Sequence, residues 1–273
     1  MMRSLFCAAP FTALLAVALL SPLLAYAAPS VFIDELTTTE VSAALQAGKT
    51  TLIIPVGGTE QSGPHVALGK HNARVGVLAE RIALQLGDAL VAPVVAYVPE
   101  GSITPPTEHM RFAGTISISD AAFKGLLTGA AQSFRQHGFK NIVLIGDHGG
   151  YQSQLKAVAA SLNQGWVGLP ARAHFVGEFY TAAQTSYVDA LKARGLTAAQ
   201  IGLHAGVADT SLLMATAPGL VRPNQFADAA KTGKAGGTTG DPRASTAELG
   251  QLGVDAIVTQ STAAIRRAVG AAR

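Results

Sequence analysis

Residues 51–72 read TLIIPVGGTEQSGPHVALGKHN, an apolar run that changes abruptly into a polar segment. The run from Thr51 to Val56 is typical of a strand that is buried on both faces. The segment after it, residues 58–72, holds one carboxylate, two histidines, three glycines and a proline. Because charged residues make up only 14% of the chain, this concentration of metal-capable side chains indicates a functional site.

Strands and helices are predicted to alternate along the rest of the chain. Further buried strands are expected at residues 90–98, 141–145 and 171–176. Helices are expected from Asn72 to Leu86, over 119–137, after residue 150, from Asp209 as N-cap, and from a capping box at 245–248. This alternation predicts a single three-layer α/β/α domain with a largely parallel sheet over residues 28–273.

Two polar segments follow strands of this predicted sheet. Residues 58–65 read GTEQSGPH and residues 146–150 read GDHGG. In open parallel sheets, ligands bind beyond the carboxyl ends of the strands. The two segments are therefore predicted to share one site.

The composition excludes some partners and some chemistry. The formal charge is only +3, and no run of Lys and Arg with interleaved aromatic residues occurs, so a nucleic-acid partner is not expected. The one cysteine, Cys7, lies in the N-terminal segment. The predicted domain therefore offers no disulfide, no thiol nucleophile and no thiolate ligand.

Residues 1–27, MMRSLFCAAPFTALLAVALLSPLLAYA, have the pattern of a secretory signal peptide. Arg3 precedes an apolar stretch that ends in the A-x-A sequence Ala25-Tyr26-Ala27. An uncleaved anchor is the alternative, since the stretch approaches the length that spans a membrane. The A-x-A ending and Pro22 favour cleavage, so we expect a periplasmic or secreted protein with no stable membrane insertion afterwards.

Three of the seven histidines, His71, His148 and His204, lie in glycine-flanked loops, and Glu60 stands at the first strand end. A carboxylate and imidazoles that converge form a site for a divalent metal, with water completing the coordination. Any one of these histidines could instead be a buried, hydrogen-bonded residue. Their convergence from separate strand ends favours a metal site.

Five segments resemble, in this order, landmarks of the creatininase (creatinine amidohydrolase) family: VGGTEQSGPHVALGKHN, TEHMRFAGTISIS, IGDHGG, HAGVADTS and GDPRASTAELG. The resemblance covers nearly all of residues 28–273. It implies a three-layer α/β fold, often oligomeric, and metal-dependent opening of amide or cyclic-amide bonds. Glu60 and His148 match metal-binding positions of the family.

Other positions depart from the family pattern. Ser62 stands where the family has a histidine, His71 replaces an Asp that bridges two metals, and Gly150 replaces a second-metal Glu of creatininase itself. A carboxylate can bridge two cations, whereas a neutral imidazole offers one lone pair. We therefore expect one metal, held by Glu60, His71 and His148. This set is known from catalytic zinc sites, although manganese or iron would also fit.

His204 and Asp209 are predicted to act beside this metal. The resemblance aligns His204 with a family histidine that moves protons at the leaving nitrogen, as amide cleavage requires. Asp209 replaces a family Glu and is interpreted as the residue that orients His204, or as an additional ligand. Its simplest structural role is that of a helix N-cap.

These observations favour a hydrolase that cleaves an amide or cyclic-amide C–N bond of a small molecule with a metal-activated water. Activity towards creatinine itself is not expected, because the ligand set is altered and the chain carries an export signal. The alternative is an exported small-molecule-binding protein on the same scaffold, with or without metal. The sequence names no substrate, and a homo-oligomer is implied only by the family resemblance.

Overall fold

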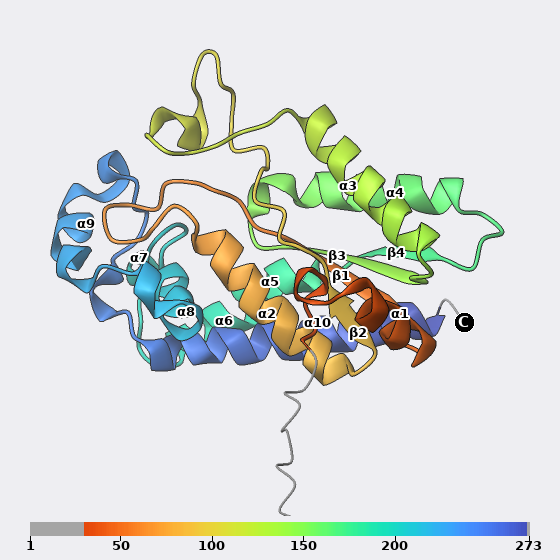
Figure 1. The fold of residues 1–273 in the computed structure, drawn as a ribbon. Coiled ribbons are helices and arrows are strands. Elements are labelled where there is room, and N and C mark those ends of the chain that lie inside the picture. Colours follow the sequence, from red (N-terminus) through yellow and green to blue (C-terminus); the bar gives the residue numbers. More distant parts are fainter. Residues whose placement is uncertain (1–29, 272–273) are drawn as a thin grey trace, which may run out of the picture.

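The computed structural model describes residues 30–271, and its centre is a four-stranded parallel sheet (Figure 1). The strands lie in the order β2 (Ala89–Val91), β1 (Thr51–Val56), β3 (Asn141–Gly146) and β4 (Arg172–Phe175). Each neighbouring pair is parallel. The strands predicted at 51–56, 141–145 and 171–176 are thus confirmed as neighbours in one sheet.

Helices cover both faces of this sheet (Figure 1). On one face lie α3 (Asp120–Gln136) and α4 (Gln152–Gly165), and on the other lie α2 (Lys70–Leu86), α5 (Glu178–Gln184) and α10 (Ala247–Ala271). Leu52 and Ile54 of β1 pack in the core beneath α3 and α4, whereas Ile53 packs in the core beneath α2 and α10. Successive side chains of a strand point to opposite faces, so an entirely apolar β1 supplies both cores. The predicted three-layer α/β/α fold is confirmed.

The remaining helices lie around this framework. They are α1 (Thr38–Gln46), α6 (Ser186–Lys192), α7 (Ala198–Ile201), α8 (Val207–Thr216) and α9 (Phe226–Thr232). Helix α8 packs against both α10 and α2. These contacts hold the turn before α8 close to the start of α2.

The second strand is shorter than the sequence predicts. A strand was expected over 90–98, but β2 ends at Val91. Pro93 has no backbone N–H to donate to a ladder, and after Ala92 the chain meets β1 again at an isolated bridge between Val95 and Val56. The segment that follows is irregular and crosses the carboxyl end of β1.

Two predicted helix starts also differ in their capping residues. Helix α8 begins at Val207 with Gly206 as N-cap, so the prediction of Asp209 as N-cap is wrong. Asp209 lies in the first turn, where its Oδ2 accepts a hydrogen bond from the Ala205 N–H at 3.0 Å. In α10, the Leu249 N–H donates to Thr246 Oγ1 at 3.2 Å, so Thr246 caps the helix in place of Ser245, the first residue of the predicted capping box.

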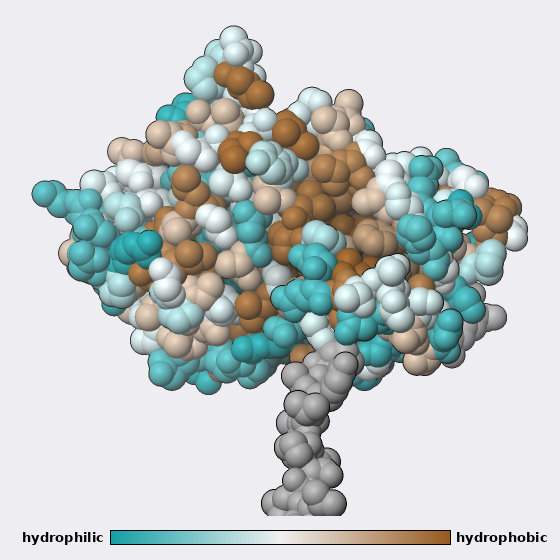
Figure 2. Space-filling view, in the orientation of Figure 1, coloured by the Kyte–Doolittle hydropathy of each residue, from teal (hydrophilic) through white to brown (hydrophobic). Residues whose placement is uncertain are grey.

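Figure 2 shows one face of the molecule, on which hydrophobic residues gather near the centre among hydrophilic ones. Among residues 30–271, no helix is both long and apolar enough to cross a membrane. The predicted signal peptide, residues 1–27, lies outside the described residues.

Candidate metal centre

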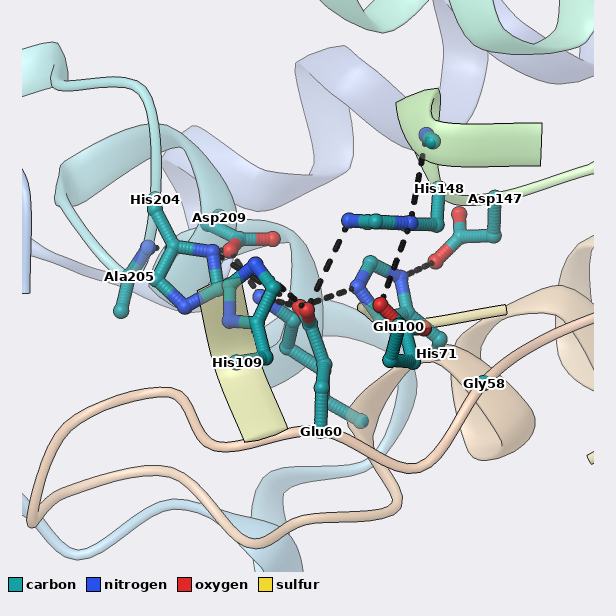
Figure 3. A network of polar contacts seen from close by, with 12 residues as sticks. Gly58, Glu60, His71, Glu100, His109, Asp147, His148, His204, Ala205 and Asp209 are labelled. Carbon is teal, nitrogen blue, oxygen red and sulfur yellow. Dashed lines mark hydrogen bonds and ion pairs between the residues drawn. The ribbon is translucent and has the colours of Figure 1, made fainter. Parts of the chain in front are cut away.

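The polar residues gather at the carboxyl end of the sheet, as the sequence predicts for a parallel α/β fold. Glu60 follows β1, and Asp147 and His148 follow β3, directly beside it in the sheet. Figure 3 shows these side chains turned toward one another, with His204 approaching from the turn before α8. Segments that are far apart in the sequence thus supply one cluster.

The loop that carries Glu60 is fixed from two sides. Asn72 in the first turn of α2 accepts a hydrogen bond from the Gly58 N–H at 2.9 Å and donates one to Thr59 Oγ1 at 3.1 Å. Gly58 has a φ of 146°, and a Cβ there would lie only 2.6 Å from Glu100 Oε1. The glycine therefore permits the close approach that brings Glu100 beside Glu60.

Four side chains offer ligand atoms that lie within 4.8 Å of one another: Glu60, Glu100, His109 and His148. Glu60 Oε2 is 3.0 Å from His109 Nε2 and 3.5 Å from His148 Nε2. Glu100 Oε2 is 3.5 Å from His148 Nδ1. Two imidazoles and two carboxylates are a donor set suited to zinc, manganese or iron.

The hydrogen-bonding state of the carboxylates also fits a cation. Glu60 Oε2 and both carboxylate oxygens of Glu100 are buried and have no hydrogen-bond partner among residues 30–271. A buried carboxylate oxygen without a partner is costly, and a metal ion removes that cost by accepting its lone pair. These oxygens point into the same group as His109 and His148, so the residues fit a divalent metal.

The other oxygen of Glu60 faces a different set of partners. Oε1 accepts a hydrogen bond from His71 Nε2 at 2.8 Å and pairs with Lys70 Nζ at 3.3 Å. His71 Nδ1 lies 2.5 Å from Asp147 Oδ2. An imidazole that donates at both nitrogens has no lone pair left for a metal.

His71 therefore lies between Glu60 and Asp147, with both ring nitrogens in hydrogen bonds, and not with a nitrogen free to bind a metal. The convergent group contains the predicted ligands Glu60 and His148. Its other two members are Glu100 and His109, and His71 is not part of it. Coordination by His71 stays a prediction, and it requires the hydrogen bond to Glu60 to be exchanged for a metal bond.

A layer of buried ion pairs lies behind these groups. Lys70 Nζ pairs with Asp209 Oδ2 as well as with Glu60. Arg74 pairs with Asp147 through Nη2 at 2.7 Å and with Asp209 through Nη1 at 2.5 Å. Lys70 and Arg74 are only 1% and 4% exposed. Because buried charges persist only when they are paired, this layer holds the first turns of α2 against the site.

The environment sets the protonation of the candidate ligands. Burial lowers the pKa of His148 to about 3, so its imidazole is neutral at neutral pH and can act as a ligand. Burial would raise the pKa of Glu60, but Lys70 and the hydrogen bond from His71 outweigh it and hold that pKa well below its usual range. Burial and the Glu60 charge together raise the pKa of Glu100 to about 8. A bound cation would favour its carboxylate form.

His71 has the opposite balance. Burial and the Lys70 charge lower its pKa, but the hydrogen bonds to Asp147 and Glu60 outweigh them, and its pKa is raised overall. This direction agrees with an imidazole that donates to two carboxylates.

His204 stands beside the group rather than within it. Its Nε2 lies 2.9 Å from the backbone oxygen of Gln61, and its Nδ1 is 3.7 Å from Glu60 Oε1. Donation from Nε2 to the Gln61 oxygen leaves the lone pair on Nδ1. Burial lowers the pKa of His204 to about 4.

Asp209 does not hydrogen-bond His204 within the described part of the chain. Its Oδ2 accepts from the N–H of Ala205, the residue after His204. Ala205 has a φ of 56°, so this bond stabilises a tight turn that a non-glycine residue rarely adopts. Any orienting effect of Asp209 on His204 therefore acts through the backbone.

Several of these side chains form one wall of a cavity of about 360 Å³. Among the residues that line it are Lys70, His109, His148 and His204 on the polar side. Aromatic side chains of α5 and α6, Tyr180 and Tyr187, line another part. A pocket that joins an apolar wall to a few convergent polar groups is typical of small-molecule sites.

Sequence reasoning did not single out Glu100 and His109. Both lie in the irregular segment between β2 and α3, where no periodicity fixes which side chains face the sheet. His109 lies within the segment TEHMRFAGTISIS, so the family resemblance contained a signal for it. Glu100 has only the weak signal of a carboxylate in a mostly uncharged stretch.

The parallel sheet, the carboxylate–imidazole cluster and the adjoining cavity define a class of α/β proteins with a metal-capable site at the strand ends. The family model described as creatinine amidohydrolase matches residues 34–265. The chain belongs to the creatininase family.

Two curated relatives are hydrolases of amide bonds by name. The mycofactocin precursor peptide peptidase of Mycolicibacterium smegmatis is 36% identical over 126 residues, which is 42% of this chain and 48% of the relative. The creatinine amidohydrolase of Pseudomonas putida is 27% identical over 204 residues, or 73% of this chain and 76% of the relative. The chain thus spans about half the length of the first relative and three quarters of the second.

Solved structures of creatininase share the fold. The crystal structure of creatinine amidohydrolase has a TM-score of 0.72 at 24% identity and covers 88% of this chain and 98% of its own. A creatininase with Mn and a creatininase variant of Zn–Zn type are each 25% identical, with a TM-score of 0.69. The Mn structure covers 87% of this chain and the Zn–Zn structure 88%, each with 98% of its own. Both metals suit the donor set found here.

Proposed function

We propose that this protein is a metal-dependent hydrolase that cleaves an amide or cyclic-amide C–N bond of a small molecule. The observation that carries the proposal is the convergence of Glu60, Glu100, His109 and His148 beside a cavity. Three buried carboxylate oxygens of this group lack hydrogen-bond partners in the part of the chain that the structure describes. The names of the two relatives, a peptidase and an amidohydrolase, support the same bond type.

The four convergent residues would hold one divalent ion, with zinc as the first candidate and manganese or iron as alternatives. Held there, the ion would supply the Lewis-acid chemistry that activates a water for attack on an amide near neutral pH. His71, the ligand predicted from the sequence, would then support Glu60 through its hydrogen bond instead of binding the metal.

His204 is proposed as the group that moves the proton. Because burial holds its pKa at about 4, its Nδ1 is unprotonated at neutral pH and can accept a proton as the nucleophile forms. The same nitrogen can then donate that proton to the leaving nitrogen, which departs only when it is protonated. The hydrogen bond from Nε2 to the Gln61 oxygen keeps the ring in place during both transfers.

Export is proposed together with this activity. It rests on the signal-peptide pattern of residues 1–27 and would place the enzyme in a periplasm or outside the cell. The small-molecule amide substrate would then be met outside the cytoplasm.

A panel of small linear and cyclic amides tests the proposal. The chain from residue 28 onward is incubated with the panel after loading with zinc or manganese and after removal of metal by a chelator. We expect release of an amine or opening of a ring only in the metal-loaded samples. Binding of panel members without turnover in any metal form would instead support a non-enzymatic binding protein.

A further inference from the structure

The two oxygens of Glu60 face different kinds of cation site. Oε2 points to His109 and His148 and accepts no hydrogen bond from any described residue. Oε1 is already paired with Lys70 Nζ and His71 Nε2. A carboxylate could bridge two metal ions, but here one of its sides is taken by groups of the protein itself.

The carboxylates of Asp147 and Asp209, behind Glu60, are likewise paired with cationic side chains of the protein. Asp209 is paired by Lys70 and Arg74, and Asp147 is paired by Arg74 and His71. Within the described cluster, the carboxylate oxygens without a hydrogen-bond partner are Oε2 of Glu60 and both oxygens of Glu100. They lie on the side of His109 and His148. The described cluster leaves room for a metal on one side of Glu60 only.

Lys70 is an unusual residue for its position. It is the first residue of α2, where the helix dipole is positive and a cation is disfavoured, and it is 1% exposed. A buried ammonium at a helix N-terminus needs strong compensation from nearby anions. Both of its carboxylate partners, Glu60 and Asp209, belong to the candidate site.

We propose that the Lys70 ammonium is a built-in cation that takes the place of a second metal ion and confines the site to one ion on the Oε2 side of Glu60. The inference rests on the proposed metal-dependent function and explains how one member of a family with a Zn–Zn structure can work with a single ion. Lys70 is a positioning residue, because it fixes Glu60 and does not need to touch the substrate.

Removal of the ammonium should create the second site. In Lys70→Ala, Glu60 Oε1 and Asp209 Oδ2 both lose their shared partner and face a volume that opens onto the cavity. We expect bound zinc or manganese, measured by elemental analysis after equilibrium dialysis, to rise from one to two ions per chain. The double variant Lys70→Ala/Asp209→Asn removes one of the two freed carboxylates and should return to one ion. Lys124→Ala, at an exposed position, should stay at one.

The outcomes separate this inference from the proposed function. No bound metal in the natural chain would contradict the metal-dependent function itself. Two ions in the natural chain, or one ion in Lys70→Ala, would overturn the role of Lys70 but leave metal dependence intact. If Lys70→Ala does not fold, a crystal structure of the metal-loaded natural chain decides. An ion on Oε2 with Lys70 still on Oε1 supports the inference, and an ion between Glu60 and Asp209 with Lys70 displaced overturns it.

Discussion

Glu60 is the residue on which the whole site depends, because one carboxylate holds both the candidate metal position and the Lys70 ion pair. Glu60→Gln keeps the shape and removes the charge. We expect metal affinity and kcat/KM to fall by at least about 100-fold, more than is usual for loss of a group outside the coordination sphere. Titration with zinc, followed by steady-state assays, measures both. Glu178→Gln, whose side chain is 44% exposed and is not part of the cavity lining, is the matched control.

His204 should affect the reaction and not the metal. In His204→Asn, the loss of proton transfer is expected to lower kcat by about 10²- to 10⁴-fold. Metal content should be unchanged, because His204 is not among the four convergent residues. His137→Asn, at the exposed C-terminal end of α3, serves as control. Loss of metal from His204→Asn would show that this imidazole is a ligand instead.

At the scale of elements, one hydroxyl adds a link to the backbone pairing at the ends of β1 and β3. Tyr151 Oη lies 2.8 Å from the Val56 oxygen and 2.5 Å from the Gly57 oxygen, and it accepts from the His148 N–H at 3.1 Å. The contact links the loop toward Glu60 with the backbone of His148. It therefore sets the spacing between two candidate ligands.

Tyr151→Phe keeps the ring and removes this link. Three buried backbone groups would lose a partner, and we expect the free energy of unfolding to fall by about 1–3 kcal/mol. Metal affinity should fall as well, since Glu60 and His148 are no longer held at a fixed separation. Denaturant unfolding and metal titration measure the two effects. Tyr97→Phe, whose ring is 57% exposed, should change neither.

The elements also show what the sequence could and could not predict. β1, β3 and α2 were predictable because apolar periodicity runs through them without interruption. β2 was predicted too long because the apolar pattern of the sequence continues past Pro93, whereas continuous strand pairing with β1 ends at Val91. The polar segments after β1 and β3 were placed correctly because parallel strands end at one edge of a sheet.

The partners of individual side chains were beyond the sequence. Glu100 and His109 reach the site through an irregular segment whose path depends on tertiary contacts. The pairing of Lys70 with Glu60 and Asp209 depends on the docking of α8 against α2. The sequence predicts His71 as a ligand because the spacing of residues cannot show that Asp147 hydrogen-bonds the ring nitrogen opposite the one that faces Glu60.

At the scale of the whole molecule, the buried histidines predict acid sensitivity. Burial lowers the pKa of His148 to about 3 and that of His204 to about 4, against an ordinary value of 6.5. At a pH between the lowered and the ordinary pKa, these two imidazoles bind more protons in the unfolded chain than in the folded one. Their contribution to the free energy of unfolding therefore falls as pH drops from about 6.5 toward 4.

The raised pKa of His71 and that of Glu100, which is about 8, offset part of this loss, because both groups bind protons more readily in the folded chain. The lowered pKa values of Glu60 and Asp209 add to the loss at the acid end of the range.

Thermal unfolding of chelator-treated protein between pH 7 and pH 4 measures this dependence. We expect Tm to fall steadily over the range and to fall less steeply in His204→Asn, which lacks one of the titrating groups. A Tm that is flat or rises on acidification would contradict the buried, neutral state assigned to these imidazoles.

The central claim is that amide hydrolysis depends on one metal ion held at the Glu60–Glu100–His109–His148 group. The most direct measurement is the rate of hydrolysis of a responsive amide as zinc or manganese is titrated into the chelator-treated chain from residue 28 onward. We expect a rate that rises linearly and stops rising at one ion per chain. A rate that does not depend on added metal, or that requires two ions per chain, would contradict it.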